Sequence, residues 1–62
     1  MFTWKITPDG PEGTCLSTDD KPTIFKHLSG KIEPIPNGTP VLEMDTSSVW
    51  MWDTENNQWR KL

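Results

Sequence analysis

Apolar and polar side chains alternate along the first residues of the chain. The run Phe2–Thr7 places Phe, Trp and Ile at every second position, with Thr and Lys between them. This period of two is typical of a half-buried β-strand. The prolines and glycines of Pro8–Gly13 then favour a turn, because proline fixes φ and glycine frees it. We therefore expect a first strand, a turn, and a short return strand over Thr14–Leu16.

The middle of the chain gives a weaker pattern. Ser17–Pro22 is rich in side-chain oxygens that compete for backbone hydrogen bonds, so we expect a loop there. Residues 23–35 fit either a short helix near 22–30, capped by Asp20 and stopped by Gly30, or a hairpin turning at Ser29-Gly30. We favour β or irregular structure, because the apolar pattern lasts barely two helical turns. The prolines around Asn37-Gly38 then predict a connector.

The C-terminal third gives the clearest signal. Three short β-prone runs, Val41–Asp45, Val49–Asp53 and Gln58–Leu62, are separated by turn-forming residues. We predict a mainly β fold: a small antiparallel sheet that ends in a three-stranded meander. The chain is read as a single small β module, residues 1–62, in which residues 1–16 hold the N-terminal strand and turn, 17–40 the loop-rich connector and 41–62 the meander.

Both faces of this meander carry apolar side chains. Leu42 and Met44 share one face of their strand, while Trp50 and Trp52 lie on the face of the next strand opposite to Met51. A sheet that is apolar on both sides needs two covers. We expect the first strand to supply one cover and a partner to supply the other.

Composition strengthens the case for a partner. A 62-residue chain with 32% hydrophobic residues has a thin core, which rarely supplies more than about 3–5 kcal/mol without a disulfide, a metal or a partner subunit. The lone Cys15 cannot close an internal disulfide, and no Cys/His spacing resembles a zinc site. Oligomerisation or docking remains as the expected source of stability.

Charge and hydropathy exclude several classes of function. The net charge is −3 and the six basic residues are scattered, which argues against nucleic-acid binding. No apolar run approaches the roughly 18 residues that span a bilayer, and the first residues lack the regions of a signal peptide. We expect a soluble protein made in the cytoplasm, with no cofactor and no membrane partner.

Four tryptophans in a chain without tyrosine form the strongest single feature. They could form the core, anchor a protein interface, or stack on sugar rings if exposed. The side chains that we assign to packing or to an interface are Trp4, Leu42, Trp50, Met51, Trp52 and Trp59.

Two other groups of residues could carry chemistry. The oxygen-rich set Asp45, Asp53, Glu55, Asn56 and Asn57 could bind calcium, but its spacing matches no EF-hand loop and its residues also favour tight turns. Cys15 and His27 could be a nucleophile and its base, but nothing in the sequence supplies an orienting group or an oxyanion hole. We expect no enzyme, no metal site and no catalytic residue.

A set of short motifs resembles small phage and prophage proteins that are often encoded among virion structural genes. The motifs are Pro36-Asn37-Gly38, Val41-Leu42-Glu43-Met44-Asp45-Thr46, Val49-Trp50-Met51-Trp52-Asp53, Glu55-Asn56 and Trp59, with Ser17-Thr18-Asp19 and Lys21-Pro22-Thr23 upstream. Together they cover somewhat more than half of the chain. Two features depart from the pattern: Ser47-Ser48 stands where Gly-Lys is expected, and residues 24–33 look like an insertion.

The resemblance implies a structural role. It suggests a component of the head, neck or fibre of a bacteriophage particle, or a decoration protein, rather than an enzyme. The implied partners are copies of the chain itself or another virion structural protein, so we expect a homo-oligomer or part of a larger assembly located in the virion. The alternative is a small carbohydrate-binding module that uses exposed tryptophans.

Overall fold

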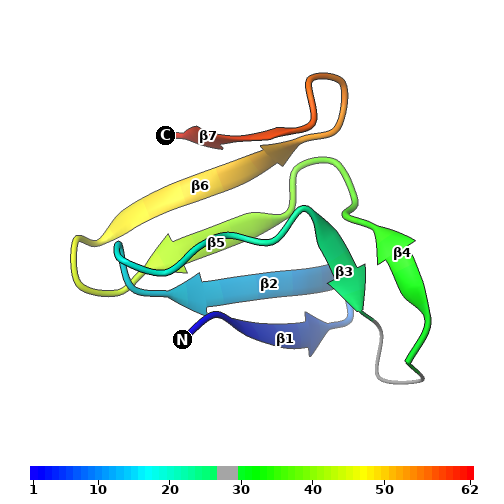
Figure 1. Ribbon diagram of the computed structural model, residues 1–62, viewed down its shortest axis with the longest axis horizontal. Helices are drawn as coiled ribbons and strands as arrows, with labels where there is room; N and C mark the ends of the chain where they lie inside the picture. Colours follow the sequence, from blue (N-terminus) through cyan, green and yellow to red (C-terminus); the bar gives the residue numbers. More distant parts are fainter. Residues whose placement is uncertain (27–29) are drawn as a thin grey trace.

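The chain folds into two β-sheets (Figure 1). The computed structural model describes residues 1–26 and 30–62. Its strands are β1 (Thr3–Thr7), β2 (Gly10–Cys15), β3 (Ile24–Lys26), β4 (Ile32–Pro34), β5 (Pro40–Glu43), β6 (Ser48–Asp53) and β7 (Gln58–Lys61). Among the described residues, no helix has the length and apolar character needed to cross a membrane.

The larger sheet has the strand order β1-β2-β5-β6-β7. The mainly β fold is confirmed, and so is the C-terminal meander, since β5, β6 and β7 pair in succession and antiparallel. The sheet is antiparallel except between β2 and β5, which run parallel, a pairing that we did not predict. Parallel neighbours require a long crossover connection, and residues 16–39 provide it.

The second strand is longer than the sequence predicts. We expected a turn over residues 8–13, but β2 begins at Gly10 and only Pro8 and Asp9 connect it to β1. Pro11 lies within β2 opposite Ile6, and a proline is tolerated in a strand where its missing N–H is not needed. The tight connection is held by Thr7, whose Oγ1 donates to the Gly10 carbonyl at 2.7 Å.

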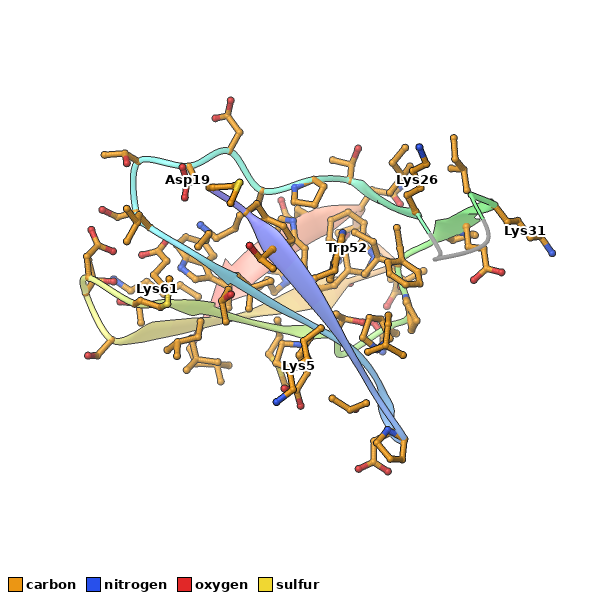
Figure 2. The ribbon with its side chains drawn as sticks, turned by 90° about the horizontal axis from the view of Figure 1, so that it is seen from below. Lys5, Asp19, Lys26, Lys31, Trp52 and Lys61 are labelled. Atoms are coloured by element: carbon orange, nitrogen blue, oxygen red, sulfur yellow. The ribbon has the colours of Figure 1, made fainter. Side chains whose placement is uncertain are left out.

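The crossover covers one face of the larger sheet. Figure 2 views the sheet close to edge-on and shows the crossover above it, with Trp52 between them, while Lys5 points away on the other side. The expectation that the first strand covers the sheet is therefore wrong. β1 is an edge strand of the same sheet, because its residues pair along their whole length with β2.

The ambiguous middle segment contains a small antiparallel pair. Phe25 of β3 lies opposite Glu33 of β4, so the helical alternative is wrong for the described part of this segment. The predicted turn at Ser29-Gly30 falls partly outside the described residues. Phe25 is buried, while Ile24 and Ile32 are exposed. Only one side of this pair therefore packs against the larger sheet.

The core forms between the crossover and the sheet. Its buried cluster consists of Phe25, Ile35 and Trp52, with Trp4 and Trp59 packed against it. Edge-to-face ring contacts, which suit the aromatic quadrupole, join Trp4 to Phe25 at 5.2 Å and Trp52 to Trp59 at 5.1 Å between ring centroids. The crossover thus supplies Phe25 and Ile35, and the strands supply the indoles.

The two hairpins of the meander share one turn geometry. Each has a four-residue loop whose last residue has a positive φ, 58° at Ser47 and 50° at Asn57. Asparagine tolerates this left-handed conformation, whereas serine adopts it less readily. Ser47 therefore holds a backbone conformation that glycine adopts more readily.

Candidate functional site

The pairing register divides the larger sheet into two faces. Residues directly opposite each other in neighbouring strands point to the same side, and successive residues alternate. Trp4, Gly13, Val41 and Trp50 follow one another across the sheet through the pairs that join their strands. We call this side, which lies under the crossover, the covered face, and the other side the open face.

The open face has an apolar centre. Thr14 pairs with Leu42, and Leu42 with Val49, while the Leu62 N–H donates to the Val49 carbonyl at 2.9 Å. A second row runs across the same strands. Each member lies opposite the next one on the neighbouring strand. In order from β1 to β7, the members are Lys5, Glu12, Pro40, Met51 and Arg60. The face is therefore apolar over β5 and β6 and charged on either side.

A shallow groove follows this apolar centre. It is lined by Glu12, Gly13 and Thr14 of β2, by Pro40, Val41 and Leu42 of β5, and by Val49 of β6. Leu42 is 40% exposed. Leu62, which follows Val49 in the row of Leu42, is 77% exposed. Contiguous apolar surface rimmed by polar residues is typical of a contact site for another macromolecule.

The six side chains that we assigned to packing or to an interface fall into two sets. The four tryptophans lie on the covered face: Trp52 is buried, and Trp4, Trp50 and Trp59 are half-buried. Leu42 and Met51 lie on the open face. The indole of Trp59 is also tied down, because its Nε1 donates to the Pro22 carbonyl of the crossover at 2.9 Å. The tryptophans therefore pack, and the aliphatic side chains face outwards.

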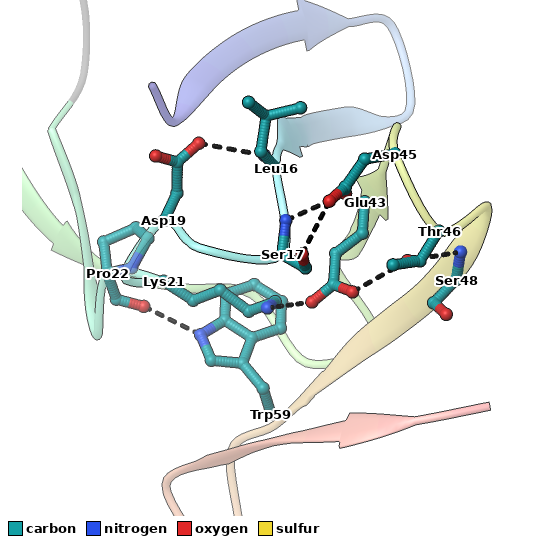
Figure 3. A network of polar contacts seen from close by, with 10 residues as sticks. All are labelled: Leu16, Ser17, Asp19, Lys21, Pro22, Glu43, Asp45, Thr46, Ser48 and Trp59. Atoms are coloured by element: carbon teal, nitrogen blue, oxygen red, sulfur yellow. Dashed lines mark hydrogen bonds and ion pairs between the residues drawn. The ribbon is translucent and has the colours of Figure 1, made fainter.

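A buried ion pair fastens the crossover to the covered face (Figure 3). Lys21 Nζ lies 2.6 Å from Glu43 Oε2, and the two side chains are only 13% and 8% exposed. The ammonium group also sits 4.4 Å from the centre of the Trp50 ring, a favourable cation–π distance. Thr46 Oγ1 donates to the other oxygen of Glu43 at 2.9 Å. We did not predict this pair from the sequence, although Glu43 shares a strand face with Val41, which is buried.

Two further carboxylates hold the beginning of the crossover. Asp45 accepts hydrogen bonds from Ser17 N at 2.9 Å and Ser17 Oγ at 2.6 Å. Asp19 accepts one from Leu16 N at 2.9 Å and forms an ion pair with the N-terminal amine at 2.6 Å. Figure 3 shows these contacts beside the Lys21–Glu43 pair, apart from the one to the N-terminus. The first residues of the crossover are thus held by several polar contacts.

These contacts predict a loss of stability in acid. The hydrogen bond from Lys21 lowers the pKa of Glu43, and Asn56 and Arg60 together lower the pKa of Asp53 to about 2. A carboxylate with a lowered folded-state pKa stabilises the fold above its unfolded pKa and stops doing so as the pH falls through the folded value. We expect the urea midpoint, followed by tryptophan fluorescence, to fall steadily between about pH 5 and pH 2.

The variant Glu43→Gln isolates the buried pair. It should be less stable than the wild type at pH 7, and the difference should narrow toward pH 2 as Glu43 of the wild type takes up a proton. Glu55→Gln is the matched control, because Glu55 lies exposed in the loop between β6 and β7. An equal loss for Glu43→Gln at both pH values would show that shape rather than charge matters at this position.

Two of the acidic sequence candidates take part in structural contacts. Asp53 binds Asn56 Nδ2 at 2.8 Å and Arg60 Nε at 2.6 Å, and Asp45 binds Ser17. Within residues 1–26 and 30–62, no three acidic, His or Cys side chains gather to hold a metal ion. Cys15 is fully buried, which raises the pKa of its thiol; its proposed partner His27 lies outside the described residues.

The meander resembles a known protein motif. The Kelch motif matches residues 38–62, the stretch that contains β5, β6 and β7. Kelch repeats form the four-stranded blades of β-propellers, so the chain is similar to part of one blade. The match indicates a β-sheet module for protein–protein interaction. Comparisons with curated proteins and with solved structures gave no match.

Proposed function

We propose that the chain is a non-catalytic interaction module that docks its open face in a larger assembly. The observation that carries the proposal is the one-sided cover of the sheet. The crossover and the aromatic core occupy one face, while Leu42 and the groove beside it remain at the surface of the other. Covering such a face removes apolar surface from water, at about 25 cal/mol per Å².

We further propose that this assembly is a bacteriophage particle. The support is the resemblance of the PNG, E-x-D-T and D-x-E-N segments to small virion-associated proteins, together with the thin core. Structural proteins of a particle meet their partners at high local concentration, so a small docking face is sufficient there. In this proposal the chain is located in the virion, and its partners are copies of itself or another structural protein.

Sugar binding through exposed tryptophans finds less support. The indoles lie on the covered face, and none of the four is among the exposed large hydrophobic residues. Stacking on a sugar ring requires an indole face open to solvent. We therefore do not propose a carbohydrate-binding function.

The proposal is tested by particle incorporation. Particles purified from the natural host should contain the wild-type chain in a fixed ratio to the major structural protein, as measured by quantitative mass spectrometry. Leu42→Lys places a charge in the centre of the open face and should lower that ratio about tenfold or more, because an unpaired buried charge is costly at an interface.

Ile24→Lys is the matched control. Ile24 is 51% exposed, comparable to Leu42, but it lies on the outer side of β3. Both variants should lose at most about 1 kcal/mol of stability, a melting shift of ~4–8 °C. Absence of the wild-type chain from particles would refute the virion role, and normal incorporation of Leu42→Lys would refute the open face as the docking surface.

A further inference from the structure

The charges that flank the open face are arranged for contact with a second copy of the chain. Glu12 lies on β2 at one side of the apolar centre, and Arg60 lies on β7 at the other, in the same row. Arg60 reaches Asp53 through Nε at 2.6 Å and its side chain is 56% exposed. One flank of the face therefore carries Glu12 beside Lys5 of the edge strand, and the opposite flank carries Arg60 beside Asp53.

We propose that two copies pack open face to open face about a two-fold axis that is parallel to the strands and lies between β5 and β6. This axis places β5 over β6 of the second copy and β2 over β7 of the second copy. Leu42 then faces Val49, and Pro40 faces Met51. Glu12 faces Arg60 of the second copy, and the contact occurs twice. The inference rests on the proposed function, since it names the partner of the same face.

The charges disfavour other two-fold arrangements. An axis along the central strand β5 would place β1 over β7 of the second copy, and Lys5 would then face Arg60. An axis perpendicular to the strands and through the row of Glu12 would place Glu12 opposite its own copy. Like charges that face each other across an interface are unfavourable. An axis between β1 and β2 would pair Lys5 with Glu12, but it would leave β5 and β6 uncovered. The axis between β5 and β6 pairs opposite charges and also covers the apolar centre. That axis also gives the aligned sheet packing common in β-sandwiches, with strand directions within about 30°.

The size of the face indicates a weak dimer. Four facing strands about 4.8 Å apart and three rows of side chains about 6.7 Å apart give ~400 Å² for each copy, or ~800 Å² in total. Stable interfaces usually bury about 1,200–2,000 Å² in total. We therefore expect weak self-association, which a particle favours because it holds copies close together.

Charge reversal tests the inference in solution. Sedimentation velocity of the wild type between about 10 µM and 1 mM should show a monomer–dimer equilibrium. Glu12→Arg and Arg60→Glu alone should each weaken it about tenfold or more, because each places two like-charge contacts in the dimer. An equimolar mixture of the two variants should form a heterodimer, seen by native mass spectrometry, within about threefold of the wild-type affinity, because opposite charges face each other again.

Matched variants control for net charge and for folding. Glu55→Arg and Lys26→Glu make the same charge changes away from the open face and should leave the dimer affinity within about threefold of the wild type. Melting curves check that each variant is folded. Glu12→Arg leaves the ion pair between Arg60 and Asp53 in place. A wild type that is monomeric at 1 mM, or a mixture no better than its components, would overturn the inference. Loss of particle incorporation in Leu42→Lys would then still support a different partner.

Discussion

Replacing Trp52 by alanine should leave the chain largely unfolded at 25 °C. Trp52 is 4% exposed and lies in the buried cluster with Phe25 and Ile35. Removing a buried tryptophan costs about 3–5 kcal/mol, from lost transfer free energy and from the cavity left behind. The core of a chain this short supplies no more than about 3–5 kcal/mol. The substitution therefore removes a free energy similar to the whole stability of the fold.

Urea denaturation followed by far-ultraviolet circular dichroism measures this effect. Met51→Ala is the matched control, because Met51 is adjacent but half-buried on the open face. It should cost ~1 kcal/mol, about half of the value for a fully buried side chain. The loss of unfolding free energy for Trp52→Phe should lie between those for Trp52→Ala and Met51→Ala. A cooperative transition for Trp52→Ala at the wild-type midpoint would show that the covered face does not hold the core.

The C-terminal meander was predictable because its information is local. The alternation in Val49–Asp53 and the turn residues that flank it specify a strand and its two hairpins without reference to the rest of the chain. The same alternation places Trp50 and Trp52 on one face and Met51 on the other. It does not specify which of the two faces is covered. The sequence therefore could not separate the side chains that pack in the core from those that lie at the surface.

The parts that escaped prediction depend on distant residues. The parallel pairing of β2 with β5 joins Thr14 to Leu42 across the whole crossover, and no local pattern encodes it. The Lys21–Glu43 pair likewise spans 22 positions. Glu43 looks like an ordinary turn-flanking acid in sequence, and only the register shows that it points into the covered face. Pairing between distant residues thus determines which face of the sheet the crossover covers and where the Lys21–Glu43 pair forms.

The open face follows from this topology. Because the crossover runs from the end of β2 to the start of β5, it can lie over only one side of the sheet. The connection between β1 and β2 and those within the meander are short hairpins, which are too short to cover the other side. The apolar groove beside Leu42 is thus a direct result of strand order, and the proposed docking surface depends on the same parallel pair that the sequence concealed.

Replacing Gly13 by alanine should destabilise the chain by about 1–3 kcal/mol, the usual cost of overpacking a core. The residue lies buried within β2, where the sequence suggested a turn. A Cβ atom there would lie 2.5 Å from Cζ of Phe2 and 2.8 Å from Cγ2 of Val41. Glycine within a strand often marks such a close approach. Here it allows the Phe2 ring to cross the strand, and it also lets Val41 pack beneath the crossover.

A double-mutant cycle separates this clash from a general effect on the strand. Thr14→Ala, at the next position and on the open face, is the control and should change the unfolding free energy by less than ~1 kcal/mol. Phe2→Leu removes the ring atoms that meet the new methyl group, so the pair Gly13→Ala and Phe2→Leu should cost at least ~0.5 kcal/mol less than the sum of the single changes. Strict additivity would mean that Val41, rather than Phe2, sets the cost, because Val41 is fully buried and its Cγ2 cannot move aside.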